Sequence, residues 1–203
     1  MDLALFDFDG TITTEDTFTP FLRFAISPSR ALLAGLFISP VLIAHRLGIL
    51  STPNTRTIVA RAGFFGAPSA TVRALGQTYA NDVLPKVLDP RAMERLQWHR
   101  QQGHTVVVVS AGLDVYLTPW CERHGVLLIC SELEERRGRL TGRYRCGDCS
   151  GPNKALLIRR DLQLEQFETV YAYGDSPEDR EMLALASRPY YQWREIAERG
   201  RAG

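Results

Sequence analysis

The chain has 203 residues, of which 45% are hydrophobic, so it can bury a substantial core as one domain or as a domain with an inserted module. Its formal net charge of +1 gives no basis for binding nucleic acid or a generally acidic partner, so any anion must be held locally. Four cysteines are too few and too scattered for a secreted disulfide framework, and no signal peptide precedes the first apolar run, so we expect a cytoplasmic protein.

The first predicted strand, residues 3–6, leads directly into two aspartates. Asp7 and Asp9 are separated by one phenylalanine and are followed by a turn that contains Thr11. Side chains alternate along a strand, so the two carboxylates point the same way if the strand continues, and they repel unless a cation or proton lies between them. Because open α/β sheets bind ligands at the carboxyl ends of their strands, this pair predicts a reactive site at the sheet edge.

Residues from about 15 to 86 are predicted to be entirely helical. The expected helices cover residues 12–24, 31–44, 53–62 and 68–83. The 31–44 segment is apolar, but it is shorter than the ~20 residues that cross a bilayer and Pro40 interrupts it, so no spanning helix is expected. Two interpretations remain open for it: a buried helix of a small bundle, which we favour, or a surface that touches lipid at the membrane interface.

The rest of the chain alternates between helices and strands. Helices are predicted over residues 90–102, 113–124, 152–160 and 177–186, strands over 105–110, 127–130 and 169–173, a hairpin over 133–145, and a frayed end over 193–203. This order predicts an α/β fold with a doubly wound, Rossmann-like parallel sheet.

The segment between the first strand and Thr105 is far longer than the ~12 residues that one crossover connection needs. We therefore predict two units. Residues 1–14 and 87–203 would form an α/β core domain, and residues 15–86 would form an inserted helical cap domain, the cap. Its point of insertion would place the cap over the first two carboxylates like a lid.

Further polar residues come after the later predicted strands and would reach the same sheet edge. Ser110 ends a Val-rich strand, Gly112 lets the next part of the backbone approach a ligand, and Asp175 comes after the last predicted strand. Lys154 supplies a positive charge. Oxygen ligands without a competing His or Cys cluster favour Mg²⁺, and a cation lets a carboxylate attack phosphorus. The CxxC spacing at 146–149 lacks a second pair, so we predict an ordinary loop there.

The polar residues occur in the order of the motifs of a known family. The four segments are Asp7-Phe8-Asp9-Gly10-Thr11, Ser110-Ala111-Gly112, Lys154, and Gly174-Asp175-Ser176 with Asp179. They resemble, in that order, the four motifs of the haloacid dehalogenase superfamily of aspartate-nucleophile phosphatases. The helical insertion between the first two motifs resembles the cap of the phosphoserine phosphatase-like branch, subfamily IB.

The resemblance implies a Mg²⁺-dependent phosphomonoester hydrolase. By position, Asp7 would attack phosphorus and form an aspartyl phosphate, and Asp9 would protonate the leaving group and later deprotonate the hydrolytic water. The resemblance further assigns phosphate binding to Thr11, Ser110, Ala111, Gly112 and Lys154, metal binding to Asp7, the Asp9 carbonyl and Asp175, and support of the metal ligands to Ser176 and Asp179.

Selectivity for the substrate is expected to reside in the cap, because the core motifs address only the phosphate. Asp16 stands where phosphoserine phosphatases carry a Glu, so phosphoserine is not the expected substrate, and Asp16, Arg23 and Arg56 are candidates for contacting the rest of the molecule. Asp16-Thr17-Phe18 with Phe21-Leu22-Arg23-Phe24, followed by the apolar 31–44 segment, are similar to phosphatidylglycerophosphatase C and its unassigned relatives. We expect a small phosphorylated organic molecule, with a lipid phosphate and peripheral membrane contact through the cap as the alternative.

Two functions of other classes use similar groups. Receiver modules of signalling systems also combine acidic residues, a hydroxyl, a lysine and Mg²⁺, but they store the phosphate and carry the phosphorylated Asp on a later strand. The spacing of Asp7 and Asp9 and the long insertion favour an enzyme. Transfer of the phosphoryl group to an acceptor other than water, as in mutases, stays open.

Overall fold

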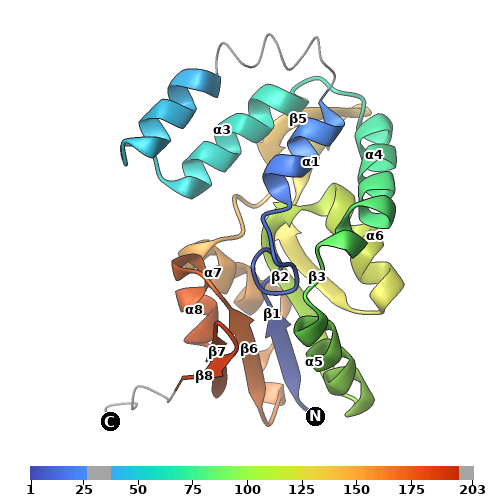
Figure 1. The fold of residues 1–203 in the computed structure, drawn as a ribbon, viewed down its shortest axis with the longest axis vertical. Coiled ribbons are helices and arrows are strands. Elements are labelled where there is room, and N and C mark those ends of the chain that lie inside the picture. The colour runs from blue at the N-terminus through green and yellow to red at the C-terminus, as the bar shows by residue number, and fades with distance from the viewer. Residues whose placement is uncertain (27–37, 197–203) are drawn as a thin grey trace.

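A computed structural model describes residues 1–26 and 38–196 of the chain (Figure 1). Its centre is a six-stranded sheet in the order β3-β2-β1-β6-β7-β8. The strands are β1 Leu3–Phe6, β2 Thr105–Leu113, β3 Leu127–Ser131, β6 Val170–Gly174, β7 Arg188–Tyr191 and β8 Arg194–Glu195. All neighbouring strands are parallel except β7 and β8. The predicted doubly wound parallel sheet is confirmed, with β1 inside it.

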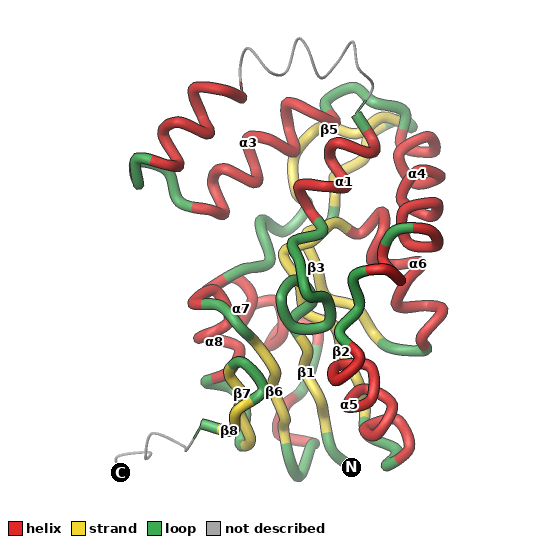
Figure 2. Tube along the Cα trace, viewed as in Figure 1, coloured by secondary structure: helices red, strands yellow, loops and turns green. Residues whose placement is uncertain are grey.

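Each face of β1 packs on a different pair of helices. The flanking helices are α5 Pro90–Gln101, α6 Asp114–His124, α7 Gly151–Asp161 and α8 Arg180–Leu183. Ala4 and Phe6 belong to the apolar layer that contains α5 and α6, whereas Leu3 and Leu5 belong to the layer that contains α7 and α8. The two helix pairs lie on opposite sides of the sheet (Figure 2). An unbroken apolar run encodes this burial on both faces.

The register of the sheet brings the ends of three strands to one edge. Phe6 of β1 is paired with Val108 of β2 and with Tyr173 of β6. The backbone N–H of Asp7 continues this ladder by donating to the Tyr173 carbonyl at 2.9 Å. The residues just after β1 and β6, and those near the end of β2, therefore emerge side by side.

The helices of the cap lie mostly above this edge (Figure 1). They are α1 Phe18–Ala25, a helix over residues 38–46, α3 Thr52–Phe64, α4 Ser69–Asp82 and the 3₁₀ turn η1 Leu84–Lys86. The hairpin of β4 Leu133–Arg136 and β5 Arg139–Tyr144 lies against them, and the N–H of Gly66 donates to the Leu140 carbonyl at 2.8 Å. Gly76 of α4 touches the Val115 backbone of α6, where a Cβ would collide. The cap is thus in direct contact with the hairpin and with α6.

The structure corrects the predicted start of the first helix. A helix was expected over residues 12–24, but α1 begins at Phe18. Residues 8–13 instead form a tight turn, in which the N–H groups of Ile12 and Thr13 donate to the Phe8 carbonyl at 2.8 and 2.9 Å. The apolar spacing over residues 12–24 therefore corresponds to a helix only from Phe18 onward.

Two predictions near the C-terminus also differ from the structure. The expected helix over 177–186 is a 3₁₀ turn, η3 Pro177–Asp179, which leads into the short α8. Residues 194 and 195 were expected to fray, but they form β8, where Glu195 pairs with Arg188 at 2.8 Å. The remaining 3₁₀ turn is η2 Leu164–Gln166. Residues 197–203 of the predicted frayed end lie outside the described residues.

The apolar segment predicted over 31–44 is described only in part. Residues 31–37 lie outside the described residues, and 38–46 form a helix with Pro40 in its first turn. Leu42 and Ile43 are exposed, and no residue of this helix is buried, which corrects the favoured interpretation of a buried helix for these positions. Within residues 1–26 and 38–196, no helix has the length and apolarity needed to cross a membrane. Contact of the cap with lipid stays a prediction.

A buried histidine connects α5 to the sheet. His99 is fully buried, its Nε2 lies 2.9 Å from the Tyr173 hydroxyl, and its Nδ1 lies 2.8 Å from Nδ1 of His104. Burial, together with the nearby charges of His104 and Arg95, lowers the pKa of His99 to about 3. The folded chain therefore holds this imidazole neutral in weak acid.

We predict that His99 makes the fold sensitive to acid. The ordinary pKa of histidine is 6.5, so His99 of the unfolded chain becomes protonated as the pH falls below this value. In the folded protein, His99 stays neutral down to about pH 3. Its share of the unfolding free energy should fall by as much as about 1.4 kcal/mol per pH unit in that window. Urea unfolding between pH 7.5 and 5 should show a shallower loss for His99→Gln than for the wild type. Equal slopes would contradict the prediction.

Candidate active site

A buried lysine joins carboxylates from two distant parts of the chain. Lys154 of α7 is only 1% exposed, and its Nζ lies 2.7 Å from Asp7 Oδ1 and 2.5 Å from Asp179 Oδ1. Burial lowers the pKa of Lys154, but the two carboxylates raise it more, so the ammonium group stays charged. Because a buried charge is stable only when paired, these contacts tie α7, the end of β1 and η3 together.

Asp179 also holds the loop after β6. Its Oδ2 accepts hydrogen bonds from the N–H of Asp175 at 3.2 Å and from the N–H and hydroxyl of Ser176 at 3.1 and 3.0 Å. Its Oδ1 is taken by Lys154. Both oxygens of Asp179 are thus engaged within the protein, which suits a supporting role better than that of a ligand.

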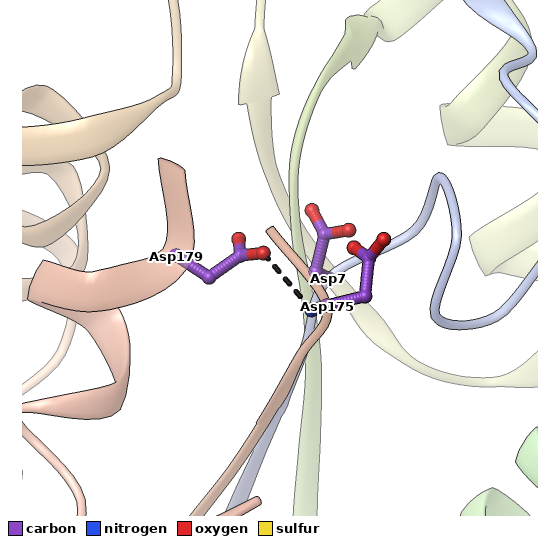
Figure 3. Close-up of side chains that lie close together, drawn as sticks. All are labelled: Asp7, Asp175 and Asp179. Atoms are coloured by element: carbon purple, nitrogen blue, oxygen red, sulfur yellow. Dashed lines mark hydrogen bonds between the residues drawn. The ribbon is translucent and has the colours of Figure 1, made fainter. Parts of the chain in front are cut away.

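Three carboxylates gather beside Lys154. One oxygen each of Asp7, Asp175 and Asp179 lies within 4.8 Å of the others, and Figure 3 shows these side chains at the ends of β1 and β6 and on η3. Gly10 permits this approach, because its φ of +80° is left-handed and a Cβ there would collide with Asp175. The Thr11 hydroxyl lies 3.5 Å from Asp175 Oδ1.

The charge of this cluster is suited to a divalent cation. Burial raises the pKa of Asp7 well above its usual range despite Lys154, and the charge of Asp179 adds to the increase. Burial, with Asp179 next, also raises the pKa of Asp175. Lys154 is one positive charge beside three carboxylates, and the carboxylates offer only oxygen donors, as Mg²⁺ prefers. The residues present fit the ion that the sequence predicts.

Asp9 is held by residues that the sequence did not single out. Its Oδ1 accepts the N–H of Thr17 at 2.8 Å and the Thr17 hydroxyl at 2.6 Å, and the Thr17 hydroxyl lies 3.2 Å from that of Tyr116. Burial raises the pKa of Asp9 to about 6, although the Thr17 hydrogen bonds lower it. No spacing rule connects Thr17 with Asp9, because the turn of residues 8–13 creates their contact.

The motif residues meet at a cavity of about 430 Å³. Its wall includes Asp7, Asp9, Ser110, Ala111, Lys154, Asp175, Ser176 and Asp179. The Ser110 Oγ accepts the N–H of Gly112 at 2.9 Å, so the serine hydroxyl hydrogen is left for another acceptor. Thr11 and Gly112 contact the site through Asp175 and Ser110. All the predicted motif residues are therefore brought together.

The three cap candidates occupy different positions. Asp16 lines the cavity, and its carboxylate also accepts the N–H groups of Phe18 and Thr19 at 3.2 and 3.1 Å at the start of α1. Arg23 lines an adjoining cavity instead. Asp16 thus combines a helix-capping role with a place at the site.

Arg56 lines the cavity, but carboxylates already bind its guanidinium group. It makes two hydrogen bonds of 2.9 Å to Asp148 and one of 2.7 Å to Glu178. These contacts bridge α3 of the cap to the loop before α7 and to η3. No sequence pattern indicates them, because the three residues are far apart along the chain. The same loop contains Cys146 and Cys149, neither of which forms a disulfide.

Comparison with known proteins finds a family whose sequence model matches this chain. The sequence model of the haloacid dehalogenase-like hydrolase family matches residues 4–184. Protein CicA of Caulobacter vibrioides is 30% identical over 192 residues, which cover 94% of this chain and 85% of CicA.

Two solved structures have a similar fold. A protein with unknown function from Bordetella pertussis Tohama I matches with a TM-score of 0.76 at 23% identity, over 94% of this chain and 89% of the other. A phosphoserine phosphatase, solved as a phospho-aspartyl intermediate analogue, matches with a TM-score of 0.62 at 20% identity, over 93% and 85% of the two chains.

We predict that Lys154 is essential for stability as well as for the site. Lys154→Ala leaves two carboxylates buried without their cation, and breaking such a contact costs about 3 kcal/mol or more. Urea unfolding in the presence of a chelator should show this loss. Lys86→Ala, which removes an exposed lysine from η1, is the matched control and should leave the midpoint unchanged. A Lys154→Ala midpoint equal to that of the control would disprove the role of the buried contacts.

Proposed function

Because the chain belongs to the family of haloacid dehalogenase-like hydrolases, we propose that it is a Mg²⁺-dependent phosphatase that hydrolyses phosphomonoesters through an aspartyl phosphate on Asp7. The observation that carries the proposal is the buried Lys154 between Asp7 and Asp179, next to Asp175 in the cavity wall. A positive charge beside a nucleophilic aspartate can offset the negative charge of the phosphate that the aspartate attacks. The fold shared with a phosphoserine phosphatase supports the same reaction.

In the first step, an oxygen of Asp7 bonds to phosphorus while the bond from phosphorus to the ester oxygen breaks. Lys154 orients the nucleophile through Asp7 Oδ1, and the Ser110 hydroxyl donates to a phosphoryl oxygen. Asp9 gives its proton to the departing oxygen. Since Thr17 donates twice to Asp9 Oδ1, the proton leaves from Oδ2.

In the second step, water attacks phosphorus and the bond to Asp7 breaks. The Asp9 carboxylate takes the proton of that water, so the acid of the first step becomes the base of the second. A pKa of about 6 allows Asp9 to serve in both forms near neutral pH. Inorganic phosphate leaves, and Asp7 and Asp9 return to their starting states.

Asp7, Asp175 and the Asp9 carbonyl would hold Mg²⁺, which when bound supplies positive charge that lets an anionic nucleophile meet an anionic phosphate. Asp179 and Ser176 would position Asp175 through their hydrogen bonds. Thr11, Ala111 and Gly112 would complete the phosphate site around Ser110 and Lys154.

The cap would select the substrate. We assign residues 1–14 and 87–203 to the core domain and 15–86 to the cap domain over the cavity. The substrate would be a small phosphorylated organic molecule in the cytoplasm, with a lipid phosphate as the alternative. Membership of a hydrolase family favours turnover over the phosphate storage of a receiver module.

A panel of phosphates tests this function. The protein with Mg²⁺ is incubated with soluble phosphomonoesters and with lipid phosphates, and release of inorganic phosphate is monitored over many turnovers. Release without any added alcohol or sugar acceptor is expected and would argue against a mutase. Labelling of the protein that stops at one phosphate per chain would favour the receiver alternative.

We predict that Asp7→Asn abolishes turnover without unfolding the protein, because the amide keeps the shape of the side chain but is a poor nucleophile. Phosphate release should fall at least about 10³-fold, and circular dichroism should stay native. Asp2→Asn, the same exchange before the opposite end of β1, should retain activity. Comparable turnover by Asp7→Asn and the control would rule out Asp7 as the nucleophile.

We predict that Asp175→Asn raises the Mg²⁺ concentration needed for half-maximal activity by about tenfold or more, since a ligand of the ion loses its charge. The titration should be repeated with Asp161→Asn, which changes an exposed carboxylate at the end of α7. If the midpoints of the two variants coincide, Asp175 does not hold the metal.

A further inference from the structure

A second cavity adjoins the one that contains the motif residues. It has a volume of about 580 Å³ and lies within the cap, between α1, the 38–46 helix and α3. Its wall includes the apolar side chains of Phe18, Leu22, Ile26, Ile38, Leu42 and Val59. Cavities of this size lined mainly by apolar side chains are typical binding sites for small organic groups.

The two cavities meet at four residues. Both are lined by Asp16, Phe18, Thr52 and Arg56. A molecule whose phosphate lies beside Asp7 can therefore extend past these residues into the cap. The part of the substrate that enters the second cavity is then the part that leaves phosphorus.

The charges at this junction disfavour an anionic leaving group. Arg56 is bound by the carboxylates of Asp148 and Glu178, and Asp16 adds a third carboxylate. The guanidinium group of Arg56 is thus paired with two carboxylates and shares the junction with a third, so little positive charge is left there for a second anion. Arg23 and His45 also line the second cavity, but neither is among the residues that the two cavities share.

We propose that the second cavity binds an apolar substituent of the leaving group, so that the substrate is an amphiphilic phosphomonoester. This inference rests on the proposed function, because it takes the phosphate to lie in the first cavity. The shared chemistry is an aliphatic chain next to a phosphate, and such a chain can come from a free alkyl phosphate or from a membrane lipid.

Binding of n-alkylphosphonates tests the inference without any turnover. With Mg²⁺ present and below the concentration at which the probes aggregate, affinity measured by calorimetry should rise about threefold per methylene from methyl to octyl, until the cavity is filled. An affinity that does not depend on chain length would overturn the inference.

Two neighbouring residues of α3 provide a matched pair of variants. Val59 lines the second cavity, whereas Ile58 is exposed and does not. Val59→Trp should reduce the ratio of octyl to methyl affinity at least tenfold, and Ile58→Trp should leave this ratio unchanged. If Val59→Trp does not fold, Leu42→Trp serves instead, because Leu42 lines the cavity at an exposed position. Equal ratios in the cavity variant and the Ile58→Trp control would overturn the inference.

Hydrolysis measurements then distinguish a free alkyl phosphate from a membrane lipid as the substrate. They also separate failure of this inference from failure of the proposed function. Faster release of phosphate from monomeric octyl phosphate than from ethyl phosphate supports a free amphiphile, and release from phosphatidic acid in phosphatidylcholine vesicles supports a membrane lipid. Hydrolysis of ethyl and octyl phosphate at equal rates, with no chain-length effect on binding, overturns this inference alone. If no phosphonate binds and no ester is hydrolysed, the proposed function fails with it.

Discussion

The buried contact of Lys154 with Asp7 and Asp179 is the interaction on which the site depends. It joins the first strand, α7 and the η3 turn, which are more than 140 residues apart at their extremes, into one charged unit beneath the cavity. Moving charged side chains out of water costs free energy, so buried charges are stable only when they pair with one another. The same contact orients Asp7, while Asp179 uses its other oxygen to hold the loop of Asp175. Stability and chemistry therefore use the same side chains.

The sequence predicted the sheet and the motif residues because both depend on local signals. The apolar run before Asp7 and the Val-rich run before Ser110 are typical of doubly buried strands, and parallel strands bring the residues after them to one edge. Contacts made by turns and distant loops have no such signal. Thr17 reaches Asp9 through a turn that was expected to be helical, and Arg56 finds its two carboxylates only after the chain has folded.

In the proposed function, the cap would provide the substrate contacts that the core motifs lack. The core motifs would contact only the phosphate, so residues above the sheet edge would contact the leaving group. There, Arg56 is bound to carboxylates of the core and holds α3 against it, while apolar side chains of α1 and α3 enclose the adjoining cavity. A charged phosphate and an apolar chain would thus each find surroundings of matching polarity.

The central claim is that Asp7 becomes covalently phosphorylated, and trapping the intermediate tests it most directly. The protein is mixed with Mg²⁺ and a phosphomonoester that it hydrolyses, and hydroxylamine is added during turnover. Hydroxylamine converts an acyl phosphate into a hydroxamate, and mass spectrometry of the peptides locates the modified residue. We predict a hydroxamate at Asp7 that appears only when both substrate and metal are present. Continued turnover with no modification of Asp7, or with the adduct on Asp9 or Asp175, would contradict the mechanism.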